Sequence, residues 1–213
     1  MLAHLSGDEA LRQAFLEGQD IHRAVASEVF GTKIEEVSSD QRSAAKAVNF
    51  GIVYGITPWG LARQLDCDPS RAATIIEDYK TRFSGIQTFL DKCVAQAKEH
   101  GYVETIMRRR RAIRSIDSSN PQQRSMGERV AINSVVQGSA ADLIKIAMNN
   151  VQTGLEEKFP HVRLLMQIHD ELVVETPESE AESVKEFLVE VMESAMDLDV
   201  PIVADASIGS SWA

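Results

Sequence analysis

The 213-residue sequence predicts an α+β protein, in which a helical first part is followed by a part that contains strands. Up to about residue 100, apolar residues recur at helical spacing between capping residues, glycines and prolines. After residue 100, β-branched residues alternate with polar ones, and the stretch RLLMQIHDELVVET, 163–176, is typical of two apolar strands joined by a tight turn. These observations place helices first and an antiparallel sheet later.

Short signals delimit the helices of the first part. The expected helices are two within residues 5–30, one that carries the stretch 42–55, and further helices over 58–65, 69–83 and about 85–100. Ser6 and Asp20 are the expected N-caps of the first two, and Gly31 and Gly101 are expected stops. In the helices over 58–65 and 69–83 a proline follows a capping residue, which is the usual place for proline at a helix start.

The second part begins with GYVETIMRRRRAIRSI, 101–116, which predicts an Arg-rich hairpin. The later expected elements are a helix opened by Asn120 and Pro121, a further helix after Gly138, the strand pair within 163–176, an acidic helix over 178–197 and a last strand over 201–208. Ser139 and Asp142 are expected to cap the helix after Gly138.

Composition limits the function classes. No run of about 18 uncharged apolar residues is present, and the first ten residues lack the pattern of a signal peptide, so we expect a cytosolic protein without a membrane partner. Cys67 and Cys93 have no metal-site spacing and predict plain thiols. The net charge of −10 is unevenly distributed, because residues 40–130 carry 15 Lys and Arg against 10 Asp and Glu, whereas residues 150–213 carry 3 against 14. The middle of the chain therefore keeps a basic surface available for a polyanion.

The stretch RSAAKAVNFGIVYG, 42–55, spaces two cations and two aromatic residues four positions apart: Arg42, Lys46, Phe50 and Tyr54. On a helix these side chains form one stripe about 18 Å long. A stripe with charges at one end and rings at the other suits a nucleoside triphosphate, and Ser38 adds a capping box at the charged end. The alternative is an ordinary amphipathic helix with solvated cations and rings in the core.

Three further groups could carry chemistry. Asp170 and Glu171 stand at the tip of the apolar hairpin, where carboxylates could hold Mg²⁺, although a solvated turn would have the same composition. The helix after Asn120 presents a polar face, which suits minor-groove acceptors but also plain solvent, through Arg129, Asn133 and Gln137. The four consecutive arginines 108–111 suit phosphates or a solvated loop.

Taken together, these groups resemble family A DNA polymerases of the bacterial DNA polymerase I type. The stripe matches the family motif Arg-x3-Lys-x3-Phe-Gly-x2-Tyr-Gly at every fixed position, and QIHDELVVE, 167–175, is similar to its His-Asp-Glu palm motif. Four other stretches resemble the family in the same order: LAHLSGDE near the start, DIHRAVASEVFG at 20–31, GYVET at 101–105 and ERVAINSVVQGSAADLIK at 128–145. The resemblance covers essentially the whole chain.

The resemblance implies roles for eleven residues. The dNTP would be bound by Arg42, Lys46, Phe50, Tyr54 and His22, and primer-template DNA by Arg129, Asn133, Gln137 and Tyr54. The residues implied in catalysis are Asp170, Glu171, His169 and Lys46, with Asp170 as a ligand of Mg²⁺. It also implies mainly a fingers subdomain over 1–118, a partial palm over 119–213, and a cytoplasmic protein associated with the bacterial nucleoid.

The resemblance further implies template-directed DNA polymerisation by a two-metal mechanism. Family members carry the second metal-binding aspartate on a strand just before the stretch that LAHLSGDE resembles, so we expect the motif A strand and the thumb to lie outside these 213 residues. We therefore expect the isolated chain to be inactive and to require an N-terminal polymerase segment as partner. The alternatives are a non-catalytic DNA- or nucleotide-binding fragment and a helical protein that binds another phosphate ligand. Arg108 and Arg114 also depart from the family, which usually has Gly and Pro there.

Overall fold

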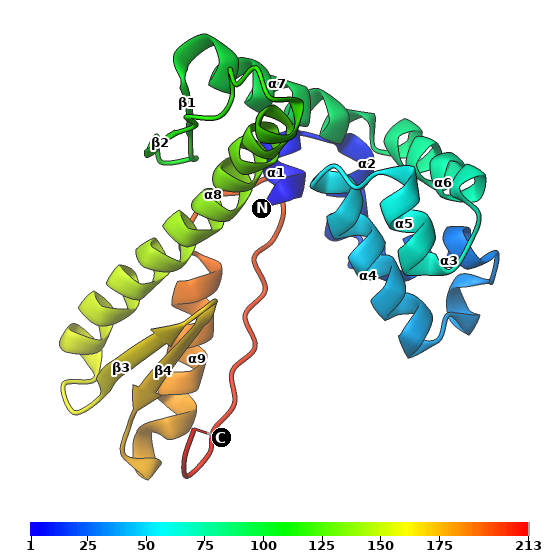
Figure 1. The fold of residues 1–213 in the computed structure, drawn as a ribbon. Helices are drawn as coiled ribbons and strands as arrows, with labels where there is room; N and C mark the ends of the chain where they lie inside the picture. The colour runs from blue at the N-terminus through cyan, green and yellow to red at the C-terminus, as the bar shows by residue number, and fades with distance from the viewer. Residues whose placement is uncertain (213) are drawn as a thin grey trace. The chain divides into compact units, whose positions relative to one another are not determined.

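The structure, a computed structural model, describes residues 1–212, apart from the side chain of Glu28. It consists of two compact units, residues 1–138 and 139–213, each of which is described by itself (Figure 1). The first unit holds the N-terminal helices, a short hairpin and the first half of a long helix. The second holds the rest of that helix, another hairpin and a C-terminal helix. Both sheets are antiparallel and two-stranded, which confirms the predicted α+β class. The predicted division into fingers and palm at residue 118 stays a prediction.

The first unit opens with α1 (Leu2–Ser6), α2 (Glu9–Leu16) and α3 (Ile21–Phe30). The prediction that Ser6 caps a helix is wrong, because Ser6 is the last residue of α1. Asp8 caps α2 instead, with its carboxylate accepting a hydrogen bond from the backbone N–H of Leu11 at 2.9 Å. Asp20 caps α3 and Gly31 ends it in a left-handed conformation, both as predicted.

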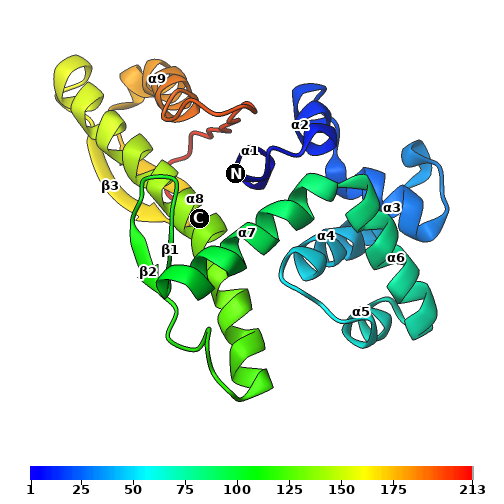
Figure 2. The ribbon, with the colours of Figure 1, turned by 90° about the horizontal axis from the view of Figure 1, so that it is seen from above.

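The next helices follow the predicted bounds closely. A 3₁₀ turn, η1 (Ile34–Glu36), leads into α4 (Ser39–Val53), and α5 (Pro58–Leu65), α6 (Pro69–Arg82) and α7 (Ser84–His100) follow. Thr57 caps α5 through its side chain, whereas Asp68 makes no capping hydrogen bond to α6. Figures 1 and 2 show α4 lying along α3 and α5 packed on α6, so these four helices form two packed pairs within this unit.

The hairpin joins β1 (Tyr102–Glu104) to β2 (Arg110–Ala112), as the Arg-rich stretch predicts. Val103 is fully buried, whereas every residue of β2 is exposed. The hairpin is therefore anchored from one strand and leaves its arginines in solvent.

Helix α8 (Pro121–Lys158) runs through Gly138 without a break, which corrects the prediction of two helices. Ser139 and Asp142 are not caps but buried residues in the middle of this helix. Gly138 has a different role, because a Cβ atom there would lie 2.6 Å from Cγ2 of Thr105. The glycine allows Thr105, which follows β1, to pack directly against the helix.

The second unit pairs β3 (Arg163–Ile168) with β4 (Glu171–Glu175), and η2 (Glu178–Glu180) and α9 (Ala181–Glu193) follow. Its core is formed by Val151, Leu155, Val162, Val184, Phe187 and Leu188. The last predicted strand, 201–208, is wrong, because these residues adopt no regular secondary structure. Among the residues that the structure describes, no helix has the length and apolarity needed to cross a membrane.

Candidate nucleotide and nucleic-acid site

Helix α4 presents three of the four stripe residues from one surface. Arg42, Lys46 and Phe50 are exposed, and Phe50 is 48% exposed although its side chain is large and apolar. The predicted capping box is present, with the Ser38 hydroxyl and the Gln41 side chain satisfying each other's backbone N–H. Tyr54 lies just beyond the last turn, at the C-cap. An exposed ring beside exposed cations favours a surface that receives a ligand over the ordinary core-facing stripe.

The two cations of the stripe have different surroundings. Nε of Arg42 donates to the Asp20 carboxylate at 2.5 Å, so the residue that caps α3 also holds a side chain of α4. Burial, the largest single cause, acts to raise the pKa of Asp20. The hydrogen bonds from Arg42 and the Arg23 backbone, together with the nearby positive charges, outweigh it, so the pKa is lowered. Lys46 has no ion-pair partner among the described residues. Lys46 is therefore a free positive charge, and Arg42 is a pre-oriented one.

His22, on the first turn of α3, lies beside this stripe. Its Nδ1 is 2.8 Å from Nδ2 of Asn49, and its ring centroid is 6.2 Å from that of Phe50. Burial and the cations Arg42 and Lys46 lower the pKa of His22, although Asp20 acts in the opposite direction. The imidazole is therefore neutral at neutral pH.

The rings of Phe50 and Tyr54 are stacked, with centroids 6.3 Å apart and an interplanar angle of 13°. Gly55 follows with a φ of +76°, a conformation that suits glycine. A Cβ atom at Gly55 would lie 3.9 Å from Cγ of Arg129. The aromatic end of the stripe thus adjoins the first residue of the predicted groove-binding set.

That set occupies the part of α8 that belongs to the first unit. Arg129 and Gln137 are exposed and Asn133 is half-buried. The amide oxygen of Asn133 is shielded from solvent and has no hydrogen-bond partner among the described residues. The helix therefore offers the exposed donors of Arg129 and Gln137 along its surface.

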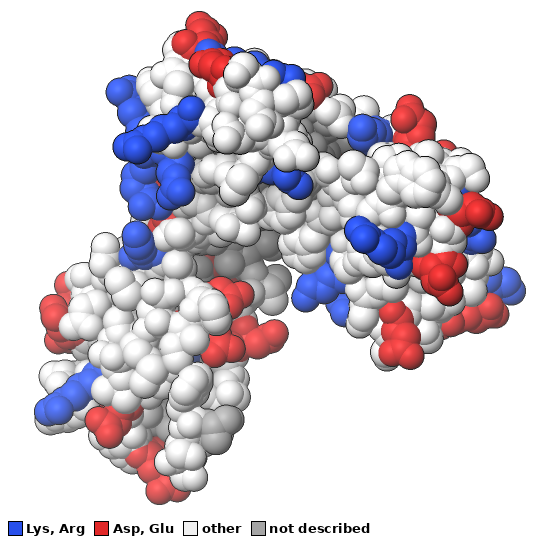
Figure 3. Space-filling model, viewed as in Figure 1, with Lys and Arg blue, Asp and Glu red and all other residues white. Residues whose placement is uncertain are grey.

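The β1–β2 hairpin carries the strongest local positive charge. Arg108 to Arg111 are all exposed, and Figure 3 shows Lys and Arg side chains gathered over this hairpin. Arg110 donates to Glu104 at 2.9 Å and lies over the Tyr102 ring, 4.6 Å from its centroid. Arg108 occupies the turn with a φ of +57°, a conformation that glycine adopts without strain.

The His-Asp-Glu hairpin lies in the second unit. Ile168 pairs with Glu171, so His169 and Asp170 alone form the turn, and His169 has a φ of +53°. Asp170 and Glu171 are exposed. Among the side chains that the structure describes, no group of three His, Cys, Asp or Glu residues is arranged to hold a metal ion. Two exposed carboxylates nevertheless fit Mg²⁺ that is shared with substrate phosphates, since such sites need only one or two protein carboxylates.

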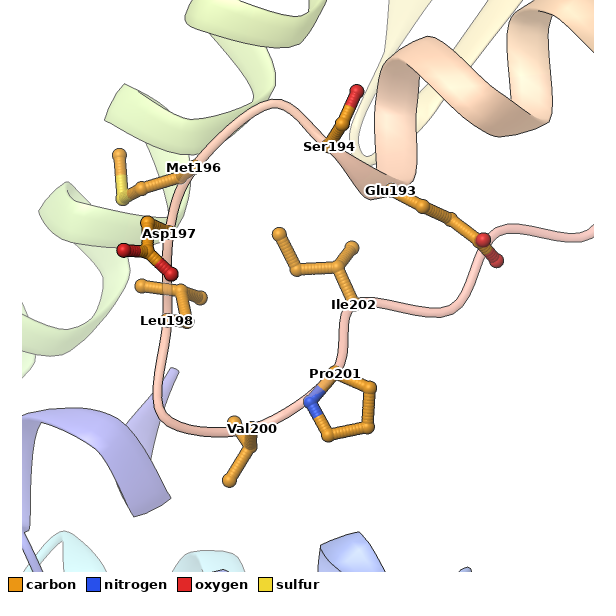
Figure 4. A pocket seen from close by; sticks show the side chains of 8 residues that line it. All are labelled: Glu193, Ser194, Met196, Asp197, Leu198, Val200, Pro201 and Ile202. Atoms are coloured by element: carbon orange, nitrogen blue, oxygen red, sulfur yellow. The ribbon is translucent and has the colours of Figure 1, made fainter.

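A shallow pocket of the second unit lies in the loop after α9 (Figure 4). Its lining residues are Glu193, Ser194, Met196, Asp197, Leu198, Val200, Pro201 and Ile202. It contains none of the predicted site residues, and it is not part of the candidate site.

Sequence reasoning missed two residues of the site. The sequence identifies Asp20 as a cap, but it does not identify Asp20 as the partner of Arg42, which lies 22 positions later. Asn49 is not singled out, because a lone amide between apolar helix residues carries no pattern of its own. Only the packing of α3 on α4 brings both residues to the stripe.

The exposed cation and aromatic face on α4, with a polar helix and a basic hairpin in the same unit, defines a surface suited to nucleotides and nucleic acid. A family model described as DNA polymerase family A matches residues 1–213, and the chain belongs to this family. It is 45% identical over 213 residues to DNA polymerase I of Lactococcus lactis subsp. cremoris and 46% identical over 212 residues to that of Bacillus subtilis.

Each of these alignments covers 100% of the chain and 24% of the relative, so the chain spans about a quarter of their length. Among solved structures, it is similar to the POL domain of Pol1 from M. smegmatis in complex with DNA primer-template and dNTP. The TM-score is 0.88 and the identity 42%, over 94% of this chain and 35% of that chain.

Proposed function

We propose that this chain carries the nucleotide-binding face and part of the catalytic centre of a DNA polymerase I type enzyme. The reaction is template-directed nucleotidyl transfer from a dNTP to the primer 3′-OH. The observation that carries the proposal is the unpaired Lys46 beside Arg42, His22 and the exposed Phe50 ring on a single surface. The M. smegmatis neighbour, which is described in complex with primer-template and dNTP, supports the choice of ligands.

In this proposal the stripe binds the dNTP from end to end. Lys46 and Arg42 bind the triphosphate through charge-assisted hydrogen bonds, and His22 donates a further one. Phe50 lies against the sugar and base of the incoming nucleotide, and Tyr54 stacks near the template base. Arg42, whose Nε is held by Asp20, directs its remaining N–H groups to a phosphate oxygen.

The duplex binds to the other basic surfaces of the first unit. Arg129, Asn133 and Gln137 contact base edges in the minor groove, where all base pairs offer acceptors at similar positions. The arginines 108–111 bind backbone phosphates without sequence preference.

Asp170 is the proposed ligand of Mg²⁺ in this chain, and His169 and Glu171 flank it near the primer end. Bound divalent ions supply positive charge to the attacking and leaving oxygens of the phosphoryl transfer. Holding two ions requires carboxylates from more than one segment, whereas Asp170 and Glu171 are adjacent residues of one hairpin. We therefore propose that the 213 residues alone are inactive and require an aspartate from a further polymerase segment.

Binding measurements test the nucleotide face. Lys46→Ala should weaken dNTP binding by about tenfold or more, because it removes a charge aimed at phosphates, and should leave primer-template binding within about twofold. Lys80→Ala, an exposed lysine in the last turn of α6, is the control and should change neither. Equal losses of dNTP and duplex binding, or no binding of either ligand by the unsubstituted chain, would contradict the proposal.

A further inference from the structure

Asn49 is a buried amide with a single side-chain hydrogen bond among the described residues. It is 7% exposed, and its Nδ2 lies 2.8 Å from Nδ1 of His22. Its own Oδ1 is buried and has no partner in the described part of the chain. A buried amide with an unpaired oxygen destabilises the fold relative to an apolar residue of the same shape. Packing therefore does not explain Asn49, whereas its bond to His22 offers a reason for it.

This bond fixes the position of the proton on His22. An amide NH₂ group can only donate, so Nδ1 of His22 must accept. The charged groups that face His22 are Asp20, Arg42 and Lys46. Burial, the largest cause, and the two cations lower the pKa of His22, whereas Asp20 acts to raise it. The net effect is a lowered pKa and a neutral ring. A neutral imidazole that accepts at Nδ1 carries its proton on Nε2. Nε2 has no hydrogen-bond partner among the residues that the structure describes.

We propose that Asn49 is a positioning residue that holds His22 in the Nε2–H tautomer, so that His22 donates one hydrogen bond to the triphosphate. The phosphate partner rests on the proposed function, whereas the tautomer itself rests on the contact between α4 and α3. The consequence is that Nε2–H of His22 becomes a third donor to the triphosphate, beside Arg42 and Lys46, and it adds no charge. Without the amide, the proton would divide between the two ring nitrogens and the ring would turn more freely.

Nitrogen and proton NMR of the ¹⁵N-labelled 213-residue chain tests the tautomer without any ligand. The His22 signals are assigned by their loss in His22→Leu. We expect Nε2 protonated and Nδ1 unprotonated in the unsubstituted chain, and a mixture of tautomers in Asn49→Leu. Asn49→Asp offers only acceptors, so it should move the proton to Nδ1 and raise the pKa of His22. Asn150→Leu, an exposed residue of α8, is the control and should leave the signals unchanged.

A double-mutant cycle tests whether Asn49 acts through His22. With tripolyphosphate and a dNTP as probes, Asn49→Leu should weaken binding about three- to tenfold, the size of one hydrogen bond. In the His22→Leu background the same substitution should have almost no effect, because the group that it positions is absent.

The outcomes separate this inference from the proposed function. An Nδ1–H tautomer in the unsubstituted chain, or an unchanged tautomer in Asn49→Leu, overturns the inference. An effect of Asn49→Leu on binding that is the same with and without His22 also overturns it. A tautomer that changes as expected with no loss of triphosphate binding overturns the phosphate role of Asn49 and leaves the proposed function intact. No triphosphate binding by any variant overturns the proposed function together with that role.

Discussion

Single residues in left-handed backbone conformations lie at two of the turns that carry candidate functional residues. Arg108 has a φ of +57° in the Arg-rich hairpin, and His169 has a φ of +53° beside Asp170. A residue with a Cβ atom is strained there by roughly 1 kcal/mol or more.

Arg108→Gly should raise the free energy of unfolding by about 1 kcal/mol, because glycine adopts the positive φ without strain. Chemical denaturation of the two chains measures the difference. Arg111→Gly is the matched control: it lies within β2, where glycine lacks a preference for the strand, and it should lower stability. Equal effects of the two substitutions would show that the turn conformation is not the cause.

Asp20 links the cap of α3 to Arg42, and its lowered pKa gives this link a pH dependence. Its carboxylate is more stable as an anion in the folded chain, so its contribution is fully present above the unfolded pKa and is lost as the pH falls through the folded value. Asp20→Asn should therefore reduce the free energy of unfolding at pH 7. The difference in free energy between the two chains should narrow only when the pH falls below the ordinary pKa of aspartate. Denaturation of both chains as a function of pH measures this, and a gap that stays constant at low pH would contradict the link.

Elements follow the sequence closely where the signal is local. The capping box at Ser38, Pro58 and Pro69 at helix starts, and Gly101 at a helix end fix their bounds to within a residue or two. The prediction is wrong at Gly138, where the local sequence indicates the end of a helix but a contact with a distant residue accounts for the glycine. Thr105 lies 33 positions away in the sequence, and no local pattern reveals that its methyl group needs the space of that glycine.

The candidate site shows the same limit. Regular spacing within one helix predicts the stripe residues, and the structure confirms that Arg42, Lys46 and Phe50 share an exposed surface. The partners Asp20 and Asn49 depend on how α3 packs against α4, which spacing does not encode. The predicted roles of the stripe, groove and hairpin residues stay predictions.

Gly138→Ala tests the contact between the hairpin and α8. Alanine favours a helix over glycine by about 1 kcal/mol, but its Cβ atom would lie 2.6 Å from Cγ2 of Thr105. We therefore expect a net loss of about 1–2 kcal/mol in the free energy of unfolding. In a Thr105→Ser background, which removes Cγ2 and keeps the hydroxyl that accepts from the Arg109 backbone, the same substitution should stabilise. A loss of equal size in both backgrounds would place the constraint elsewhere.

At the scale of the whole chain, the basic and acidic regions coincide with different proposed functions. Residues 40–130 are locally basic and hold the proposed cationic contacts to nucleotide and duplex, whereas residues 150–213 carry 3 Lys and Arg against 14 Asp and Glu. An acidic neighbourhood suits a site that gathers divalent cations and would repel a polyanion without them. The net charge of −10 is therefore compatible with DNA binding.

Primer extension tests the central claim that Asp170 provides one half of a two-segment metal site. We expect no template-directed synthesis by the 213-residue chain alone with Mg²⁺ and dNTPs. Synthesis should appear when the chain is joined to, or mixed with, the polymerase segment that precedes the matched region in the Bacillus subtilis relative, and Asp170→Ala should abolish it. Mg²⁺-dependent extension by the chain alone that Asp170→Ala abolishes, or no extension when the segment is supplied, would contradict the account.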